Sequence, residues 1–393
     1  MSEKQYDYLI VGAGIIGMTI AYQLLKNSKN IKILIIDKES DVAKHASGRN
    51  SGVLHAGFYY TKDSLKAKFT VDGNRYMREF CKQNSIFVNE TKKIVIAKNE
   101  QELQTLLELQ TRAQVNGVET KIIDEEELKE IDANIKTYKK ALYSPTTASV
   151  NPTEVCMKLK EILLDSGVEF LFNTEFAKSE LEYKYLINSA GAYADKIAKE
   201  FGVAQEYTML PFKGIYLKYM QDKSVIKTNI YPVPNLANPF LGVHYTITVD
   251  GSIKIGPTAI PALWRENYKG FENFSFFEMC EVLYYEVKLF TLNSFHFRDL
   301  ALSEVRNYAK SVFIQKAKDM VYTIGDDFKA MPAGIRAQLL DKRTNELVQD
   351  FVVEHAKNST HILNAVSPAF TCSFAFAKHV VSEINQREEK REI

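Results

Sequence analysis

The sequence predicts an α/β fold in which a doubly wound domain is interrupted by a second, mixed α+β domain. Three observations lead to this prediction. An apolar strand at Tyr8–Val11 turns at Gly12 into a helix, and a second apolar strand ends at Asp37, as in a parallel sheet with crossover helices. The 393 residues exceed the roughly 250–300 at which one core stops growing, so two domains are expected.

The elements alternate along the whole chain. After the first unit, helices are predicted over 63–84, 100–117, 151–167, 274–290 and 300–321, and strands over 92–99, 168–173, 185–188 and 360–366. The stretch from about Leu210 to Asp326 is richer in aromatic and strand-like runs, and "VDGS" at 249–252 predicts a hairpin turn. The last helix is expected to begin at Ser367–Pro368, with Ser367 as N-cap and Pro368 at the first helical position.

This alternation predicts two discontinuous domains. Residues 1–88, 145–210 and 327–393 would form the Rossmann-like domain, and residues 89–144 and 211–326 the inserted domain that binds the substrate.

Composition excludes several classes of protein. The formal net charge of +1 gives no sign of a nucleic-acid partner. Four scattered cysteines and seven dispersed histidines predict no metal site and favour a reducing, cytoplasmic compartment. The uncharged run at 8–25 contains three glycines, so a strand–turn–helix unit explains it better than a signal peptide or a membrane span.

The glycines of this run carry the clearest chemical signal. Gly12-x-Gly14-x-x-Gly17 follows a strand and opens a helix, and Asp37 lies 20 residues beyond Gly17. The first glycine permits a tight turn, the second lets backbone approach a pyrophosphate, and the third lets helix and strand pack closely. Asp37 would accept hydrogen bonds from a ribose diol. The pattern predicts a dinucleotide, and its position at the start of a long chain with one such motif favours FAD over NAD.

A second polar segment, "SGRNSGVLHAGFYY" at 47–60, follows the second strand without helical or strand periodicity. It resembles the signature of the L-2-hydroxyglutarate oxidase/dehydrogenase family, within the D-amino-acid-oxidase-like flavoproteins. The blocks "SLKAKF", "LPFKGIYL", "IYPVPNLANPFLGVHYT", "DGSIKIGP", "MPAGIRAQ" and "NAVSPAFTCS" agree in order along nearly the whole chain. The chain departs from the family at "ETKKIVIA", at Thr258 and in "SPAFTCSFAFA", which makes substrate range less secure than fold and cofactor.

The resemblance implies FAD-dependent oxidation of L-2-hydroxyglutarate to 2-oxoglutarate, with hydride transfer to flavin N5. His55 is the expected base, because a group with a pKa near neutrality suits removal of the hydroxyl proton. Cations or strong donors are needed for a dicarboxylate, and these are expected from Arg336, His244, Lys213 and Tyr60.

The cofactor-binding residues are expected in five segments. Gly12, Gly14, Ile15, Ile16, Gly17, Asp37 and Lys38 belong to the first unit, Ser47, Arg49, Asn50, Ser51 and Gly52 to the polar segment, and Ala190, Gly191, Gly334, Ser367, Pro368 and Thr371 to later turns. Arg49 as a plain surface arginine is an equal alternative. The final helix would direct its N-terminal dipole at the flavin. Cys372 is interpreted as a small packing residue.

Other readings stay open at this point. The same fold acts on other 2-hydroxy acids, amino acids or glycerol 3-phosphate, and a flavin-binding protein without turnover is a further possibility. The electron acceptor, oxygen or a quinone, does not follow from the sequence. The resemblance also allows loose association with the inner face of a membrane.

Overall fold

The structure is a computed structural model that describes residues 5–177, 181–234 and 240–392. The helices are α1 (Ile15–Asn27), α2 (Leu65–Gln83), α3 (Glu100–Val115), α4 (Glu125–Ile131), α5 (Pro152–Asp165), α6 (Ala194–Glu200), α7 (Phe276–Leu292), α8 (Phe297–Val305), α9 (Lys310–Lys318) and α10 (Ala369–Glu392). The sequence block "IYPVPNLANPFLGVHYT", which begins at Ile230, is described only in part, because residues 235–239 lie outside the described residues.

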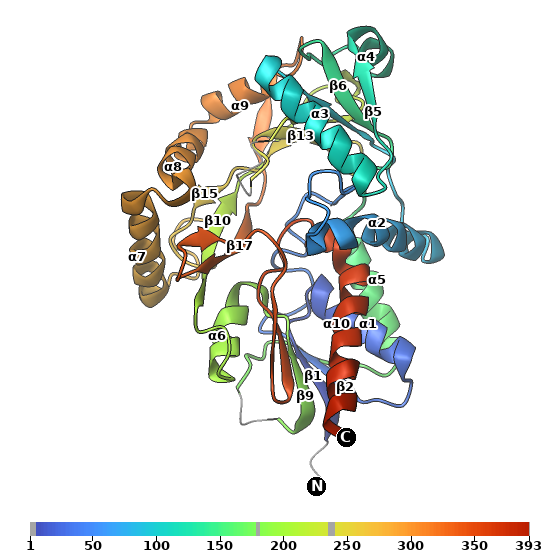
Figure 1. The fold of residues 1–393 in the computed structure, drawn as a ribbon, viewed down its shortest axis with the longest axis vertical. Coiled ribbons are helices and arrows are strands. Elements are labelled where there is room, and N and C mark those ends of the chain that lie inside the picture. Colours follow the sequence, from blue (N-terminus) through green and yellow to red (C-terminus); the bar gives the residue numbers. More distant parts are fainter. Residues whose placement is uncertain (1–4, 178–180, 235–239, 393) are drawn as a thin grey trace.

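A six-stranded sheet forms the lower half of the molecule in Figure 1. Its order is β19 (Val353–Ala356), β20 (Ser359–Ile362), β9 (Tyr183–Asn188), β1 (Tyr6–Val11), β2 (Ile33–Ile36) and β8 (Glu169–Leu171). All neighbouring pairs are parallel except β19–β20. The predicted doubly wound sheet is therefore confirmed.

Side chains of this sheet alternate between two apolar layers. Ile10 and Ile35 face α1, α5 and α10, whereas Leu9 and Leu34 pack toward α6. Because successive residues of a strand point to opposite faces, a sheet covered by helices on both faces needs continuous apolar strands. This explains the "YLIV" and "ILII" runs of the sequence.

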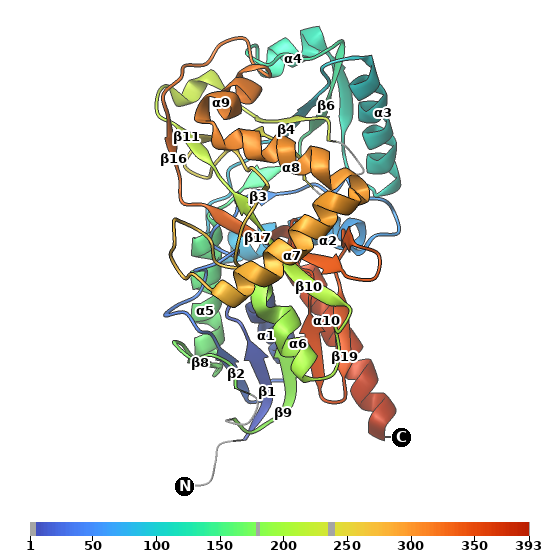
Figure 2. The same ribbon diagram turned by 90° about the vertical axis from the view of Figure 1, so that its left-hand side faces the viewer.

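An eight-stranded sheet forms the upper half, with α3 packed on one face and α9 on the other (Figures 1 and 2). Its order is β16 (Phe328–Ala330), β11 (Leu217–Tyr219), β14 (Ile253–Gly256), β13 (His244–Ile247), β12 (Asn229–Pro232), β4 (Lys93–Ile96), β6 (Lys140–Ser144) and β5 (Lys121–Asp124). Only β12 and β4 pair in parallel, so the expected antiparallel tendency is confirmed. The hairpin predicted at "VDGS" joins β13 and β14.

Two smaller sheets connect the halves. β10 (Tyr207–Gly214) pairs along its whole length with β17 (Gly334–Asp341), between β15 (Ile260–Pro261) and β18 (Glu346–Leu347). β3 (Val53–Leu54) pairs with β7 (Ala148–Ser149). β10 crosses the predicted domain boundary at residue 210, and β16 pairs with β11 although it lies beyond residue 327. The division into two domains stays a proposal. Because β16 belongs to the eight-stranded sheet, the last boundary between the two domains is better placed after β16 than before residue 327.

Two predicted helices differ in detail. The helix predicted over 300–321 is broken into α8 and α9 by a 3₁₀ turn and by Ala309 in an extended conformation. The last helix begins at Ala369, because the Pro368 carbonyl is the first to accept an intrahelical bond, from Cys372. Among the described helices, none is long and apolar enough to cross a membrane. Association with a membrane surface stays a prediction.

Candidate functional site

One cavity of about 580 Å³ runs through the middle of the molecule. At one end it is lined by residues that follow the carboxyl ends of β1, β2 and β9, including Gly12, Asp37 and Ala190. At the other end it is lined by His55, His244 and Arg336. Ligands of doubly wound sheets bind outside the carboxyl ends of the strands, so its first end is a candidate nucleotide site.

The turn after β1 requires glycine for two reasons. Gly12 has φ = +102°, and a Cβ there would lie 2.5 Å from the Ser189 carbonyl oxygen. A Cβ at Gly17 would lie 2.2 Å from the Gly12 oxygen, which explains the close contact between α1 and the turn. The predicted conformational roles of both glycines are therefore confirmed.

Asp37 and Ser47 hold the start of α1. Asp37 accepts from the Ala13 nitrogen at 2.7 Å and from the Glu39 nitrogen at 2.9 Å. The Ser47 hydroxyl accepts from the Ile15 nitrogen at 2.9 Å. Both side chains line the cavity, so they join the second strand and the polar segment to the helix N-terminus.

Asn50 and Arg49 of the polar segment mainly bind backbone of the segment and of the residues just before it. Asn50 donates to the carbonyls of Ala46 and Ser47 and accepts from the Gly52 nitrogen. Arg49 donates to the Lys44 carbonyl at 2.7 Å, and its guanidinium lies 4.3 Å from the centre of the Tyr268 ring. The sequence predicted these residues as free hydrogen-bond donors for the cofactor. In the structure, several of their donor groups already bind loop carbonyls and so fix the loop.

Most of the predicted cofactor residues line the cavity. These are Gly12, Gly14, Ile15, Ile16, Asp37, Lys38, Ser47, Arg49, Asn50, Ser51, Ala190, Gly191, Gly334, Ser367, Pro368 and Thr371. Gly17 and Gly52 do not line it, and both lie where a Cβ would meet backbone within 2.3 Å. They permit the close packing behind the wall.

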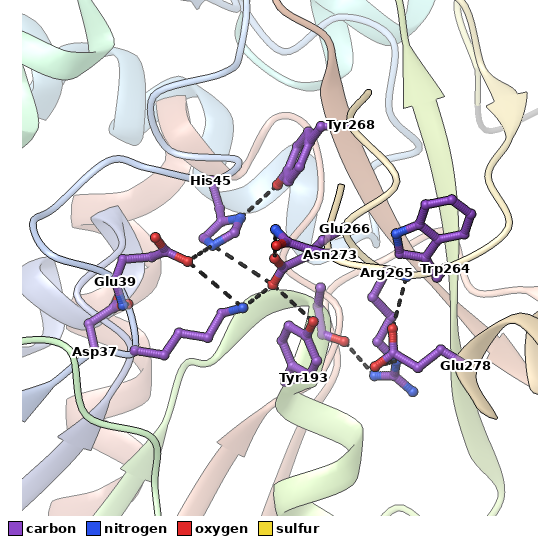
Figure 3. A network of polar contacts seen from close by, with 12 residues as sticks. Asp37, Glu39, His45, Tyr193, Trp264, Arg265, Glu266, Tyr268, Asn273 and Glu278 are labelled. Atoms are coloured by element: carbon purple, nitrogen blue, oxygen red, sulfur yellow. Dashed lines mark hydrogen bonds and ion pairs between the residues drawn. The ribbon is translucent and has the colours of Figure 1, made fainter. Parts of the chain in front are cut away.

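A polar network beside the Asp37 end was not predicted (Figure 3). Glu266 pairs with Lys38 and accepts from the Tyr193 hydroxyl at 2.9 Å. His45 bridges Glu39, at 2.8 Å, and the Tyr268 hydroxyl, at 2.7 Å. The segment between β15 and α7 is thereby tied across to the residues that follow β2.

Within the described residues, the same network contains one group of side chains that could hold a metal ion. Glu39, His45 and Glu266 have candidate ligand atoms within 4.8 Å of one another. The Lys38 ammonium pairs with Glu266 and lies 3.8 Å from Glu39, so it already supplies the positive charge. Arg265, fully buried, pairs with Asp195 and donates to it at 3.0 Å, which anchors the segment a second time.

His55 is held from both sides of its backbone at the other end of the cavity. Its N–H donates to the Thr371 hydroxyl at 3.2 Å, and its carbonyl accepts from Asn74 at 3.0 Å. Its Nδ1 lies 3.4 Å from Nζ of Lys93. Burial, and then the nearby Lys93, lower the pKa of His55 well below its ordinary 6.5. His55 is therefore a neutral imidazole at neutral pH.

His244 differs from the expectation. Its ring stacks on Tyr231 with centroids 3.8 Å apart, and its Nδ1 lies 2.8 Å from the Gly242 carbonyl, to which it must donate. Burial lowers the pKa of His244 to about 3. The ring is therefore neutral with a bare Nε2, which accepts hydrogen bonds. It is unsuited to the predicted role as a cation or donor for a carboxylate.

Arg336 lines the cavity as predicted, whereas Lys213 and Tyr60 do not. Arg336 pairs in register with Phe212, so Lys213, the next residue on β10, points to the opposite face. There Lys213 donates to Asn267 at 3.2 Å. The Tyr60 ring lies 5.9 Å from Nζ of Lys66, and Tyr60 is near enough to Arg336 for the two groups to affect each other's pKa. A direct role of Lys213 on a substrate is corrected accordingly, and a role of Tyr60 stays a prediction.

Three buried lysines near this end were missed. Burial lowers the pKa of Lys66 and of Lys93 to about 7, and that of Lys254 to about 8. Arg336 faces Lys66, and Lys254 donates to the Ser51 carbonyl at 3.2 Å. A signal existed in the sequence, because Lys93 begins the apolar strand "KIVI" and Lys254 interrupts the apolar strand "IKIG". We refer to Arg336, Lys66, Lys93 and Lys254 as the cationic end.

The first end of the cavity fits a dinucleotide. The turn at Gly12, the carboxylate of Asp37 and the N-terminus of α1 meet there. Elsewhere in the cavity wall, a Cβ at Gly334 would lie 2.7 Å from the Arg49 carbonyl oxygen, so this position has no room for a side chain. Phosphates are favoured at a helix N-terminus by the helix dipole and the free N–H groups.

Comparison with known proteins agrees with this geometry. Residues 7–383 match the family described as FAD dependent oxidoreductase. The chain is 34% identical to L-2-hydroxyglutarate dehydrogenase of Escherichia coli strain K12, over 96% of this chain and 93% of that protein. The chain belongs to the L-2-hydroxyglutarate dehydrogenase family of FAD-dependent oxidoreductases.

Further similarities reinforce the assignment. The chain is 32% identical to the mitochondrial L-2-hydroxyglutarate dehydrogenase of Homo sapiens, over 99% of this chain and 90% of that protein. Among solved structures, the FAD-bound L-α-glycerophosphate oxidase of Mycoplasma pneumoniae superposes with a TM-score of 0.75 at 21% identity, over 97% and 95% of the two chains. This FAD-dependent oxidoreductase therefore has the predicted fold and cofactor, and catalyses FAD-dependent oxidation.

Proposed function

We propose that this enzyme oxidises L-2-hydroxyglutarate to 2-oxoglutarate. The observation that carries the proposal is the cationic end, where Arg336 lines the cavity, Lys93 and Lys254 lie buried near its two histidines, and Lys66 lies buried near Arg336. The similar proteins from Escherichia coli and Homo sapiens bear the name of this activity.

The charge of this region suits a dianion. Burying an ammonium or guanidinium group is unfavourable unless a negative charge compensates it. Burial lowers the pKa of each of the three lysines and of Arg336, so each cation lies in a poorly solvated place. A substrate with two carboxylates would add two negative charges to this region, and a monocarboxylate would add one.

Arg336 is the proposed ligand of one carboxylate. It lines the cavity beside Phe240, with its guanidinium 5.2 Å from the ring centre. An arginine binds a carboxylate through two parallel hydrogen bonds, and such a pair fixes orientation as well as position.

His55 is the proposed base. Oxidation of the alcohol breaks the O–H and the C–H bond at the same carbon, and FAD, when bound, supplies the hydride acceptor at N5. His55 would take the hydroxyl proton, because it is neutral and rigidly held at the cavity wall. The bare Nε2 of His244 would accept a second hydrogen bond from the substrate or from water.

The cofactor would be held by the residues of the first end. We propose that the turn at Gly12 and the N-terminus of α1 bind the diphosphate, and that Asp37 binds the ribose diol. The start of α10, from Ser367 to Thr371, would direct its dipole toward the flavin ring.

Anaerobic mixing of the purified yellow protein with single compounds tests this function. L-2-hydroxyglutarate should bleach the flavin rapidly, and D-2-hydroxyglutarate, L-malate, glycine and glycerol 3-phosphate should not. Rapid bleaching by another compound would replace the proposed substrate, and no bleaching by any would favour a binding role. Oxygen or a quinone added afterwards identifies the acceptor by the return of colour.

The role of His55 is tested by the variant His55→Ala. Flavin should remain bound while its reduction by L-2-hydroxyglutarate slows by about 10²-fold or more. An unchanged reduction rate would remove His55 from the mechanism and leave the substrate assignment intact.

A further inference from the structure

Lys93 lies next to His55, outside the lining of the cavity. It begins β4, its side chain is fully buried, and it does not line the cavity, whereas His55 does. Its Nζ lies 3.4 Å from Nδ1 of His55. Because Nδ1 faces Lys93, Nε2 is the nitrogen of His55 that remains available to a ligand.

The surroundings of Lys93 are aromatic. Its Nζ lies 4.0 Å from the centre of the Tyr231 ring, 5.2 Å from that of Tyr59 and 5.6 Å from that of Phe58. Within the described part of the chain, no carboxylate forms a salt bridge with it. A lysine so placed loses its proton readily, since little besides the aromatic faces compensates its charge.

We propose that Lys93 is a positioning residue for His55 and the acceptor of its second proton. The unprotonated amine of Lys93 accepts a hydrogen bond from Nδ1–H of His55, which leaves Nε2 bare toward the cavity. The inference rests on the proposed function, because it gives a place to the proton that His55 removes.

The proton transfer balances without another reactant. The substrate O–H bond breaks as the Nε2–H bond of His55 forms, and the Nδ1–H bond breaks as the third N–H bond of Lys93 forms. The imidazole ends neutral and the positive charge ends on Lys93. FAD, when bound, would accept the hydride together with its electron pair.

The protonation states agree with this order. Burial lowers the pKa of Lys93 to about 7, and the pKa of His55 lies well below 6.5. The titratable groups around the pair are the neutral His244, Arg336, Lys254 beside His244, and Tyr59 and Tyr231, whose rings face Lys93. A bound dianion would raise the pKa of Lys93. The opposite arrangement, an ammonium that donates to Nδ1, would leave the imidazole proton on Nε2, where it prevents His55 from acting as a base.

The tautomer of His55 is the most direct readout. The chain has seven histidines, so selective ¹⁵N labelling of histidine gives a tractable spectrum, and His55→Gln identifies the signals of His55. At pH 8 we expect a protonated Nδ1 and a bare Nε2. A protonated Nε2 with a bare Nδ1 would overturn the proposal whatever the activity of the enzyme.

Two substitutions separate the two roles of Lys93. In Lys93→Met both are lost, so the tautomer preference should weaken and flavin reduction should slow at least about tenfold. In Lys93→Gln the amide oxygen still accepts from Nδ1–H but takes up no proton, so the tautomer should persist while reduction slows. Lys92→Met is the matched control, because Lys92 is the adjacent, exposed lysine.

The pH profile excludes a merely structural effect. At saturating substrate, the reduction rate of the unmodified enzyme should rise through a limb above pH 7, as Lys93 loses its proton. This limb should be absent in Lys93→Met and present in Lys92→Met. The limb could persist in Lys93→Met while the substitution His55→Ala still slows flavin reduction. This result would refute the role of Lys93 and leave the proposed function standing. A reduction rate that does not depend on His55 would remove both residues from the mechanism, whereas failure of the proposed function itself would appear as no bleaching of the flavin by L-2-hydroxyglutarate.

Discussion

The two ends of the cavity are built in different ways. At the Asp37 end, the shape comes mainly from backbone: a turn at Gly12, the start of α1 and carbonyls that exclude side chains. At the cationic end, the charge comes from long side chains of α2, β4, β14 and β17, which are far apart in the chain, and of these four side chains Arg336 lines the cavity. The Asp37 end is built from residues close together in the sequence, and its backbone leaves almost no room for an added atom. Ligand binding at the cationic end depends instead on charge.

Gly12→Ala should have the largest effect, because it adds a side chain at the Asp37 end of the cavity, where binding depends on the shape of the backbone. The new Cβ meets Ser189 at 2.5 Å, and φ = +102° adds about 1–3 kcal/mol of backbone strain. We expect a protein purified without yellow colour. Gly117→Ala is the control, since Gly117 also has positive φ but has no atom within 4 Å of a Cβ position. Full flavin content in Gly12→Ala would show that the turn is not the cofactor cradle.

Arg336→Met should have the next largest effect, at the end that depends on charge. Loss of a buried partner of a carboxylate costs about 2–5 kcal/mol, so the Kd of L-2-hydroxyglutarate should rise about 10²-fold or more with flavin still bound. The Kd is obtained from the concentration dependence of anaerobic flavin reduction. Arg298→Met, in which an exposed arginine is removed, should leave it unchanged. An unchanged Kd in Arg336→Met would place the carboxylate elsewhere.

The affinity for a dianion should fall as pH rises. Lys66 and Lys254, with pKa values of about 7 and 8, are protonated below these values and lose their positive charge above them. We expect 2-oxoglutarate to bind roughly tenfold more weakly at pH 9 than at pH 6, measured by perturbation of the flavin spectrum. Lys254→Met should flatten this dependence. Affinity that increases with pH would contradict the proposed charge complementarity.

Lys38→Met should have the smallest effect. It removes the partner of Glu266 in the network of Figure 3, and Lys38 is partly exposed, so water screens the pair. About 1 kcal/mol or less is expected, which means FAD release up to about fivefold faster, followed by flavin fluorescence. Lys121→Met, which removes an exposed ion pair of the other sheet, is the control. Unaltered release would show that this network plays no part in retaining FAD.

The comparison of the two ends also explains what the sequence could predict. The Gly12 turn and Asp37 were predicted because their geometry is encoded within one strand–turn–helix unit. His55 was singled out only through its surrounding motif. Lys93 was missed because its contact with His55 depends on the pairing of β4 with β12, which no local pattern reveals.

Lys213 shows the converse limit. A sequence block identifies it as a candidate, but the side of the strand on which it lies follows from register. Only the pairing of Phe212 with Arg336 shows that Lys213 faces away from the cavity. Likewise, the role of His244 follows from its hydrogen bond to the Gly242 carbonyl, which is set by the fold around it.

The central claim is that the cationic end selects a substrate with two carboxylates. Anaerobic flavin reduction by L-2-hydroxyglutarate and by L-2-hydroxypentanoate, which has the same chain length but one carboxylate, tests it most directly. The account predicts that the dicarboxylate reduces the flavin at least about 10²-fold more efficiently. Equal efficiency of the two compounds would contradict it.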